Sequence, residues 1–121
     1  MSDVVWGATV IDCPDPVALG RFYASLLGCE AIVTDTDWVD VVVPGAVRLS
    51  FQQVDDFVPP SWPSNEHPQQ AHLDFDVADL DQTERFALSL GATKASDQPG
   101  ELFRVFIDPA GHPFCLVLHD V

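Results

Sequence analysis

The sequence DCPDPVALGRFYASLLG at positions 12–28 returns in altered form as DVADLDQTERFALSLG at positions 76–91. Both stretches contain D-x-x-D, then five residues, then R-F-x-x-S-L followed by a glycine. A shared pattern at this many ordered positions indicates an internal repeat, in which each copy is one supersecondary unit. The chain is therefore predicted to contain two copies of one small module.

Each copy is predicted to form a strand, a helix and three further strands. An aspartate before the apolar residues at helical spacing marks each helix start, Asp15 in the first copy and Asp79 in the second. Gly28 supplies a helix stop in the first copy. The predicted strands cover 6–12, 29–34, 38–43 and 47–54 in the first copy and 71–77, 92–95, 102–107 and 114–118 in the second, and the second helix ends near Leu90.

The stretch between the copies, residues 55–69, contains four prolines together with Phe57 and Trp62. Proline lacks the backbone donor that helices and central strands need, so this stretch is predicted to be a linker. The expected organisation is one domain over residues 1–121, with a first module at 1–54, the linker at 55–69 and a second module at 70–121. The linker either simply connects the modules or covers the mouth of a pocket with Trp62.

Charge and composition exclude several classes of function. The chain has 19 acidic and 5 basic residues, a formal net charge of −14, so it lacks the basic face that nucleic acids and anionic membranes require. No apolar run reaches the roughly 20 residues of a membrane-spanning helix, and the first residues do not resemble a signal peptide. Three cysteines without a C-x-x-C pair fit a reduced protein, so we expect a cytoplasmic location.

Three strings carry a resemblance to a known family: CPDPVALGRFYASLLG, PSWPSNEHPQQAHLDFDV and FIDPAGHPFCLV. They resemble the small glyoxalase-like proteins of the vicinal oxygen chelate superfamily, which also includes bleomycin-resistance proteins, fosfomycin-resistance proteins and ring-cleaving dioxygenases. The resemblance implies an α+β fold of two tandem βαβββ modules, whose curved mixed sheets surround a cavity. It also implies a homodimer. It does not specify a reaction, because the superfamily contains both enzymes and binding proteins.

Metal-dependent members of this superfamily hold their ion with residues at four positions, on the first, fourth, fifth and eighth strands. In this chain those positions fall on Ala8, on Phe51 or a neighbour, on His72 and on Cys115. Only His72 matches the family pattern, so no family metal centre and no cofactor are expected. An alternative is a divalent ion, such as zinc, held by His72, Asp74 and Cys115.

Strand alternation predicts which side chains face the cavity. Leu73 and Phe75 should pack against the second helix, which sends their neighbours to the other face. The positions predicted to face the cavity are Ala8, Val10 and Asp12, Phe51 and Gln53, His72, Asp74 and Asp76, and Cys115 and Val117. Asp74 replaces Val10 of the first copy, and this asymmetry favours a functional pair of His72 and Asp74.

The leading functional hypothesis is a glyoxalase-like protein that binds a small neutral or cationic molecule without the family's metal centre. Its expected binding residues are His72, Asp74, Gln53, Cys115, Trp38 and Trp62. A second hypothesis is a lyase or isomerase of the glyoxalase type, in which His72, with Asp74, acts as acid or base or His72 recruits a metal. A third is a non-catalytic interaction module. His112 is assigned to a tight turn rather than to catalysis.

Overall fold

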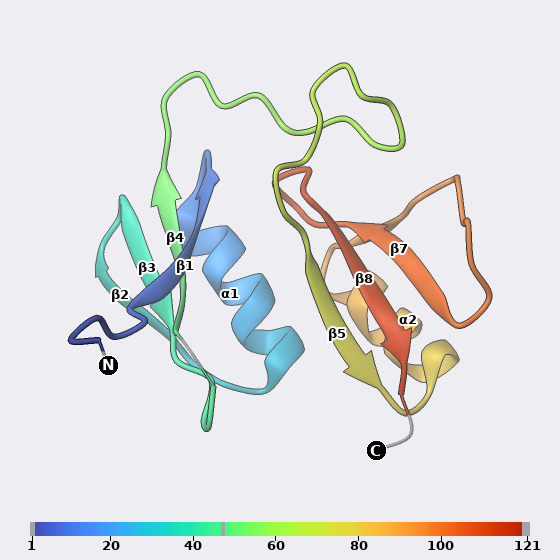
Figure 1. Cartoon of the computed structure of the whole chain (residues 1–121), viewed down its shortest axis with the longest axis horizontal. Coiled ribbons are helices and arrows are strands. Elements are labelled where there is room, and N and C mark those ends of the chain that lie inside the picture. Colours follow the sequence, from blue (N-terminus) through green and yellow to red (C-terminus); the bar gives the residue numbers. More distant parts are fainter. Residues whose placement is uncertain (1, 47, 120–121) are drawn as a thin grey trace. The chain divides into compact units, whose positions relative to one another are not determined.

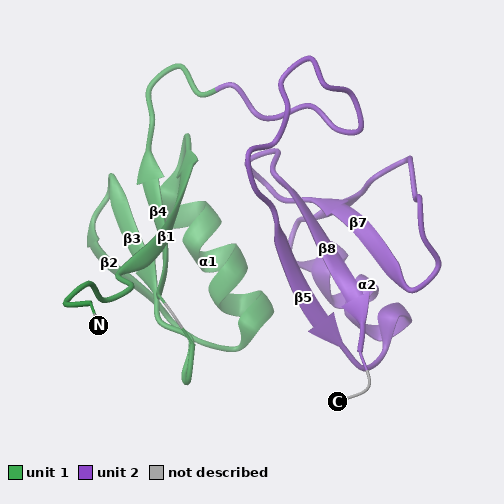
Figure 2. Ribbon diagram, viewed as in Figure 1, with its two compact units in different colours: residues 1–57 green, residues 58–121 purple. Residues whose placement is uncertain are grey.

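The computed structural model describes residues 2–46 and 48–119 and divides the chain into two compact units, residues 1–57 and 58–121 (Figure 2). Each unit contains one four-stranded mixed sheet and one helix, in the order strand, helix and three strands (Figure 1). This α+β architecture is the one that the family resemblance implies, and the order of elements is the one that the repeated pattern predicts. No helix in the described part of the chain has the length and apolar character needed to span a membrane.

In the first unit the strands are ordered β1-β4-β3-β2, with β1 parallel to β4 and the other neighbours antiparallel. The element bounds are β1 Ala8–Cys13, α1 Pro16–Leu27, β2 Ala31–Asp35, β3 Trp38–Val41 and β4 Arg48–Gln53. The strand predicted to begin at Trp6 therefore begins two residues later. The predicted start of the fourth strand, Val47, lies outside the described residues.

In the second unit the order is β5-β8-β7-β6, with β5 parallel to β8 and again antiparallel pairing elsewhere. The element bounds are β5 Leu73–Val77, α2 Leu80–Ser89, β6 Thr93–Lys94, β7 Phe103–Ile107 and β8 Pro113–Leu118. The two sheets therefore have the same topology, as the internal repeat predicts. Residues 58–72, which include most of the expected linker, contain no helix or strand and belong to the second unit.

The helix starts are fixed by the residues that the sequence singles out. The side chain of Asp15 accepts a hydrogen bond from the backbone N–H of Ala18 at 3.2 Å, and Asp79 accepts one from Gln82 at 3.0 Å. These bonds satisfy N–H groups that a helix cannot pair internally. Gly28 ends α1 in the left-handed conformation, with φ of 69°.

Aromatic stacking on the helix side of each sheet shows which face is the core. In the first unit Tyr23 of α1 stacks on Phe51 of β4 with ring centroids 5.5 Å apart, and both side chains are fully buried. In the second unit Phe106 stacks on Phe114 at 5.7 Å, and Phe75 meets Phe114 edge-on at 6.0 Å. Each sheet therefore has a helix-covered face and an opposite face.

The packing of Phe51 against α1 corrects one sequence prediction. Phe51 does not face the cavity side of its sheet, and Gln53 shares its alternation. The residues of β4 with the opposite alternation include Ser50, which pairs with Val10 of β1. The sequence of β4 does alternate, since polar Ser50 separates apolar Leu49 and Phe51, so the rule applied to β5 would have placed Phe51 on the helix side.

Helix α1 approaches its sheet closely at Gly20. A Cβ atom at this position would lie 2.6 Å from Cγ1 and 3.3 Å from Cβ of Val39, a fully buried β-branched side chain with little freedom to move.

We predict that Gly20→Ala destabilises the protein by about 1–2 kcal/mol in urea unfolding. Overpacking costs roughly 1–3 kcal/mol and exceeds the gain of about 1 kcal/mol in helix propensity.

Gly7→Ala is the matched control, because nothing lies within 4 Å of a Cβ there. The double variant Gly20→Ala/Val39→Ala should be less destabilised than the sum of its two single variants, since Val39→Ala makes room for the new methyl group. If the loss of stability in the double variant equals the sum of the losses in the two single variants, the proposed contact between position 20 and Val39 is contradicted.

Candidate functional site

The face of the second sheet opposite α2 presents a layer of side chains fixed by strand register. Asp74 of β5 pairs with Cys115 of β8, and Cys115 pairs in turn with Val105 of β7. The alternate residue Arg104 points the other way and forms ion pairs with Asp81 and Glu84 of α2. The open face therefore combines a carboxylate, a thiol and an apolar side chain in one row.

A pocket of about 330 Å³ lies on this open face. Its volume falls at the lower end of the roughly 300–1,000 Å³ typical of small-molecule sites. Three of its lining residues, Trp62, Gln69 and His72, come from the segment before β5, and the others come from the open face or its margin. The lining residues are Trp62, Gln69, His72, Asp74, Phe103, Val105, Pro113, Cys115 and Val117.

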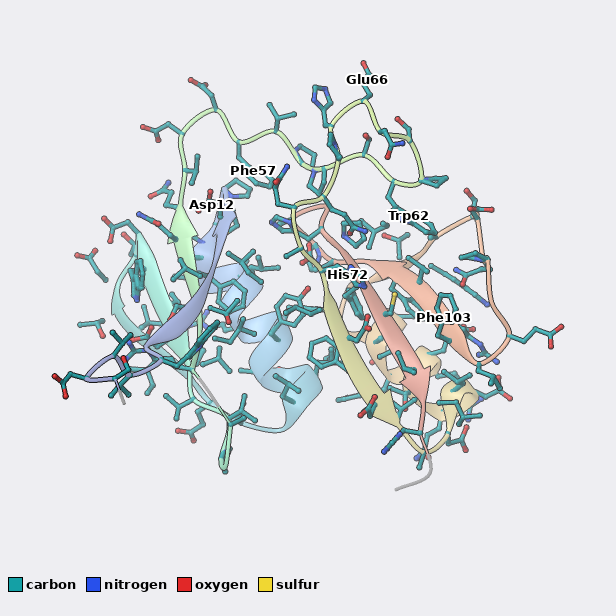
Figure 3. All side chains as sticks on the ribbon, in the orientation of Figure 1. Asp12, Phe57, Trp62, Glu66, His72 and Phe103 are labelled. Carbon is teal, nitrogen blue, oxygen red and sulfur yellow. The ribbon has the colours of Figure 1, made fainter. Side chains whose placement is uncertain are left out.

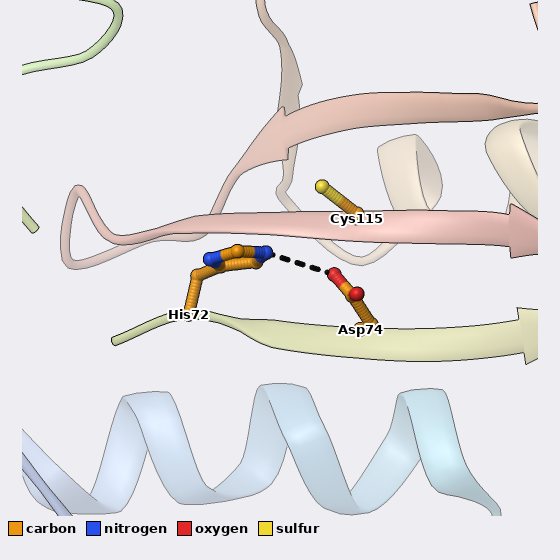
Figure 4. A group of neighbouring side chains, drawn as sticks. All are labelled: His72, Asp74 and Cys115. Atoms are coloured by element: carbon orange, nitrogen blue, oxygen red, sulfur yellow. Dashed lines mark ion pairs between the residues drawn. The ribbon is translucent and has the colours of Figure 1, made fainter. Parts of the chain in front are cut away.

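Three chemically active side chains meet in this pocket (Figure 4). Nε2 of His72 lies 3.0 Å from Oδ1 of Asp74. One possible ligand atom from each of His72, Asp74 and Cys115 lies within 4.8 Å of the others. His72 and Asp74 are partly exposed, with 39% and 55% of their side-chain surfaces accessible, so both can meet a molecule that enters the pocket.

The environment of Cys115 keeps its thiol protonated. Burial, together with the charge and hydrogen bond of Asp74, raises the pKa of Cys115 to about 11. A thiol with this pKa is almost entirely uncharged near neutral pH and is a poor nucleophile. The protonated thiol donates a hydrogen bond to the carboxylate of Asp74. The same carboxylate also contacts the imidazole of His72.

The segment that contains Trp62 packs against the turn between β7 and β8. Gly111 in this turn has φ of 100°, and a Cβ atom there would lie 2.6 Å from Cβ of Pro59. Farther along the segment, Ser61 and His67 close a loop through two hydrogen bonds of 2.7 and 2.8 Å. The pocket wall bearing Trp62 is therefore held by defined contacts within the second unit, although it contains no regular secondary structure (Figure 3).

Gln69 carries a polar atom without a partner. Its side-chain Oε1 is buried and has no hydrogen-bond partner among the described residues. Leaving a buried acceptor unsatisfied costs roughly 1–3 kcal/mol. The residue lines the pocket, whereas this oxygen is itself buried from solvent.

The six expected binding residues are divided between the two units. His72, Asp74, Cys115 and Trp62 line the pocket of the second unit, whereas Gln53 and Trp38 belong to β4 and β3 of the first. Trp38 Nε1 donates to Oδ1 of Asp40 at 2.9 Å, and the buried Ser50 hydroxyl donates to the same oxygen at 2.6 Å. Trp38 is thus part of a polar cluster on the first sheet.

Four pocket residues escaped the sequence analysis: Gln69, Phe103, Val105 and Pro113. Gln69 lies at the end of the proline-rich stretch, and Phe103 starts a strand that reads as an ordinary core element. His112 lies in the β7–β8 turn as expected. Its backbone N–H donates to the Asp108 carboxylate at 3.0 Å, and its carbonyl accepts from the Asp108 N–H at 2.9 Å.

The residues do not fit the four-position metal centre of the superfamily. Ala8 has no donor atom, and Phe51 packs its ring against α1. The set of His72, Asp74 and Cys115 offers one nitrogen, one oxygen and one sulfur atom, a combination that suits zinc. Its use as a metal site requires loss of the Cys115 proton, because the thiolate is the ligand.

Comparisons with known proteins identify the family and the fold. A model of the glyoxalase-like domain matches residues 8–117. No curated protein matches the chain. Among solved structures, the oxidase ChaP-H2 is 23% identical, with a TM-score of 0.68 over 98% of this chain and 96% of that one.

Two further solved structures share the fold. A glyoxalase/bleomycin resistance protein/dioxygenase family enzyme from Burkholderia phytofirmans PsJN is 18% identical, with a TM-score of 0.69 over 91% of this chain and 94% of that one. The fosfomycin resistance protein FosX from Mesorhizobium loti is 16% identical, with a TM-score of 0.68 over 100% and 96%. The chain belongs to the glyoxalase-like domain family of the vicinal oxygen chelate superfamily.

The raised pKa of Cys115 predicts slow alkylation. At pH 8 roughly one thiol in a thousand is ionised when the pKa is about 11, so iodoacetamide should modify Cys115 very slowly, with a rate that rises about tenfold per pH unit up to that value. Asp74→Asn should lower the pKa of Cys115 and increase its alkylation rate at pH 8 several-fold. The rate should stay below that of an exposed cysteine, because burial raises the pKa more than Asp74 does. Peptide mass spectrometry of chelator-treated protein measures the rate.

Asp76→Asn is the matched control, since it removes a neighbouring exposed carboxylate of β5 that does not line the pocket. Rapid alkylation of Cys115 at pH 7 in the wild-type protein would contradict this description of its environment.

Proposed function

We propose that the chain is a binding protein for a small neutral or cationic molecule, held in the pocket of the second unit. The observation that carries this proposal is the convergence of His72, Asp74 and Trp62 on one pocket of about 330 Å³. Pockets of this kind combine apolar walls with a few polar groups that orient the ligand. Here the walls come from Val105, Val117 and other apolar side chains.

Charge supports the preference for a neutral or cationic ligand. Asp74 places a carboxylate in the pocket, and the formal net charge of the whole chain is −14. The field of such a protein attracts cations and repels anions. A cationic ligand would also gain a charge-assisted hydrogen bond to Asp74.

A matched series of benzene derivatives tests the charge preference. Benzamidine, benzamide and benzoate have similar size but are cationic, neutral and anionic. We predict that benzamidine binds most tightly and benzoate most weakly, as measured by backbone amide shifts in NMR titrations. Asp74→Asn should remove most of the difference between benzamidine and benzamide, because it removes the charge and keeps the shape.

His119→Ala, on the exposed residue beyond β8, is the control and should leave the series unchanged. Tightest binding of benzoate would contradict the proposed charge preference. Shifts that avoid the pocket residues for all three compounds would contradict the proposed site.

The contact between His72 and Asp74 favours a second candidate, a lyase or isomerase of the glyoxalase type. A histidine whose Nε2 is held at 3.0 Å by a carboxylate is oriented for proton transfer. In this candidate His72 holds or moves the proton, while Asp74 positions the ring. Loss of turnover of α-oxo or thiohemiacetal substrates in His72→Ala would support it. An ion held by His72, Asp74 and Cys115 would polarise a substrate oxygen.

Metal analysis separates the binding proposal from metal-assisted catalysis. For protein purified without a histidine tag or chelator, the binding proposal predicts far less than one divalent ion per chain, even after exposure to Ni²⁺, Zn²⁺ and Mn²⁺ and removal of excess ion. Elemental analysis by mass spectrometry measures the content. About one tightly held ion per chain, lost in His72→Ala and kept in the control His67→Ala, would instead make metal-assisted catalysis the leading function.

A further inference from the structure

We infer that the loop between β6 and β7, residues 95–102, sets the width of the pocket, and that Gly100 is its specificity-determining residue. Because Gly100 has no side chain, the ring of Phe103 can lie against the loop and leave the pocket open. The inference rests on the proposed binding function, which it extends from the charge of the ligand to its bulk. Residues 95–102, all of them described, do not line the pocket themselves.

The side chain of Phe103 forms part of the pocket wall. Phe103 and Val105 alternate along β7 with Arg104, whose side chain turns to α2, so both lie on the open face of the sheet. The strand register pairs Phe103 with Val117 of β8, another residue that lines the pocket. The ring of Phe103 therefore borders the pocket on the β7 side.

Gly100 provides the space that this ring occupies. A Cβ atom at position 100 would overlap with Cε1 of Phe103 and would lie only 2.7 and 2.8 Å from Cδ1 and Cζ. Gly100 does not have a positive φ, so its backbone conformation does not itself require glycine. The ring of Phe103 is thus what excludes a side chain at this position.

The loop is anchored on both sides of Gly100. The side chain of Gln98 donates to the carbonyl of Val105 at 2.8 Å and accepts from the N–H of the same residue at 2.9 Å. On the other side, the carbonyl of Leu102 accepts from the N–H of Leu118 in β8 at 2.8 Å. A side chain at position 100 would therefore displace the ring more easily than the backbone.

The sheet order gives the direction of this displacement. β7 lies between β8 and β6, and the Val105 carbonyl that Gln98 binds also accepts from the residue after β6 at 3.1 Å. The loop therefore follows the β6 side of β7, whereas Val117 lies on the β8 side. A methyl group at position 100 would push the ring of Phe103 toward β8 and narrow the pocket.

Benzamidine and cyclohexanecarboxamidine form the test pair, since both carry a cationic amidine group and only the second has a thick, saturated ring. A narrower pocket penalises the thicker ring more, because overpacking is costly. We expect Gly100→Ala to weaken the binding of cyclohexanecarboxamidine at least threefold more than that of benzamidine in the same NMR titrations. When Gly100→Ala is added to Phe103→Leu, the ratio of the two dissociation constants should not change.

The methyl signals of Val117 report the position of the ring without any ligand, because an aromatic ring shifts the resonances of nearby methyl groups. They should move in Gly100→Ala. They should keep their position in the matched control Gly7→Ala, where nothing lies within 4 Å of a Cβ atom. Thermal unfolding checks that each variant is folded.

Equal losses of affinity for the two amidines in Gly100→Ala, or a selective loss that persists without the Phe103 ring, would overturn the inference while leaving the pocket as a binding site. Unmoved Val117 methyl signals in Gly100→Ala would overturn it without reference to a ligand. Failure of both amidines and of the whole benzamidine series to bind the wild-type protein would instead overturn the proposed function, and with it the role of Gly100 in specificity.

Discussion

The parallel pairing of β5 with β8 is the constraint on which the candidate site depends. It places Asp74 beside Cys115, and the alternation of both strands then sends Phe75 and Phe114 to the helix side. A slip of one residue in either strand would exchange the two faces, burying the carboxylate under α2 and exposing the phenyl rings. Core packing and pocket chemistry are thus two results of a single register.

The same constraint explains why the two copies of the module differ in chemistry without differing in fold. In the first sheet the corresponding row contains Val10, Ser50 and Asp40, whereas the second contains Asp74, Cys115 and Val105. Each row has one carboxylate, but it lies on an inner strand in the first unit and on an edge strand in the second. In the first unit the carboxylate of Asp40 accepts hydrogen bonds from Trp38 and Ser50. In the second unit the carboxylate of Asp74 contacts His72 and Cys115.

Much of this fold is readable from local signals, because they act within a few residues. The aspartate caps and the glycine stop define the helices, and apolar alternation identifies the face of β5 correctly. The placement of Phe51 was wrong although the sequence alternates apolar Leu49 and Phe51 with polar Ser50 and Gln52, a pattern that assigns Phe51 to the core. The position of Gln69 in the pocket wall could not be predicted. It depends on how an irregular segment folds over a sheet, and no local pattern encodes that arrangement.

The contact between Pro59 and Gly111 gives the wall of the pocket an unusual sequence dependence. The proline ring occupies the space that the side chain of any residue other than glycine would need, in a turn fifty-two positions later. Gly111 therefore cannot gain a side chain while Pro59 stays in place. A side chain at Gly111, which does not line the pocket, would push against the segment that bears Trp62, so the shape of the pocket wall depends on a turn outside the pocket.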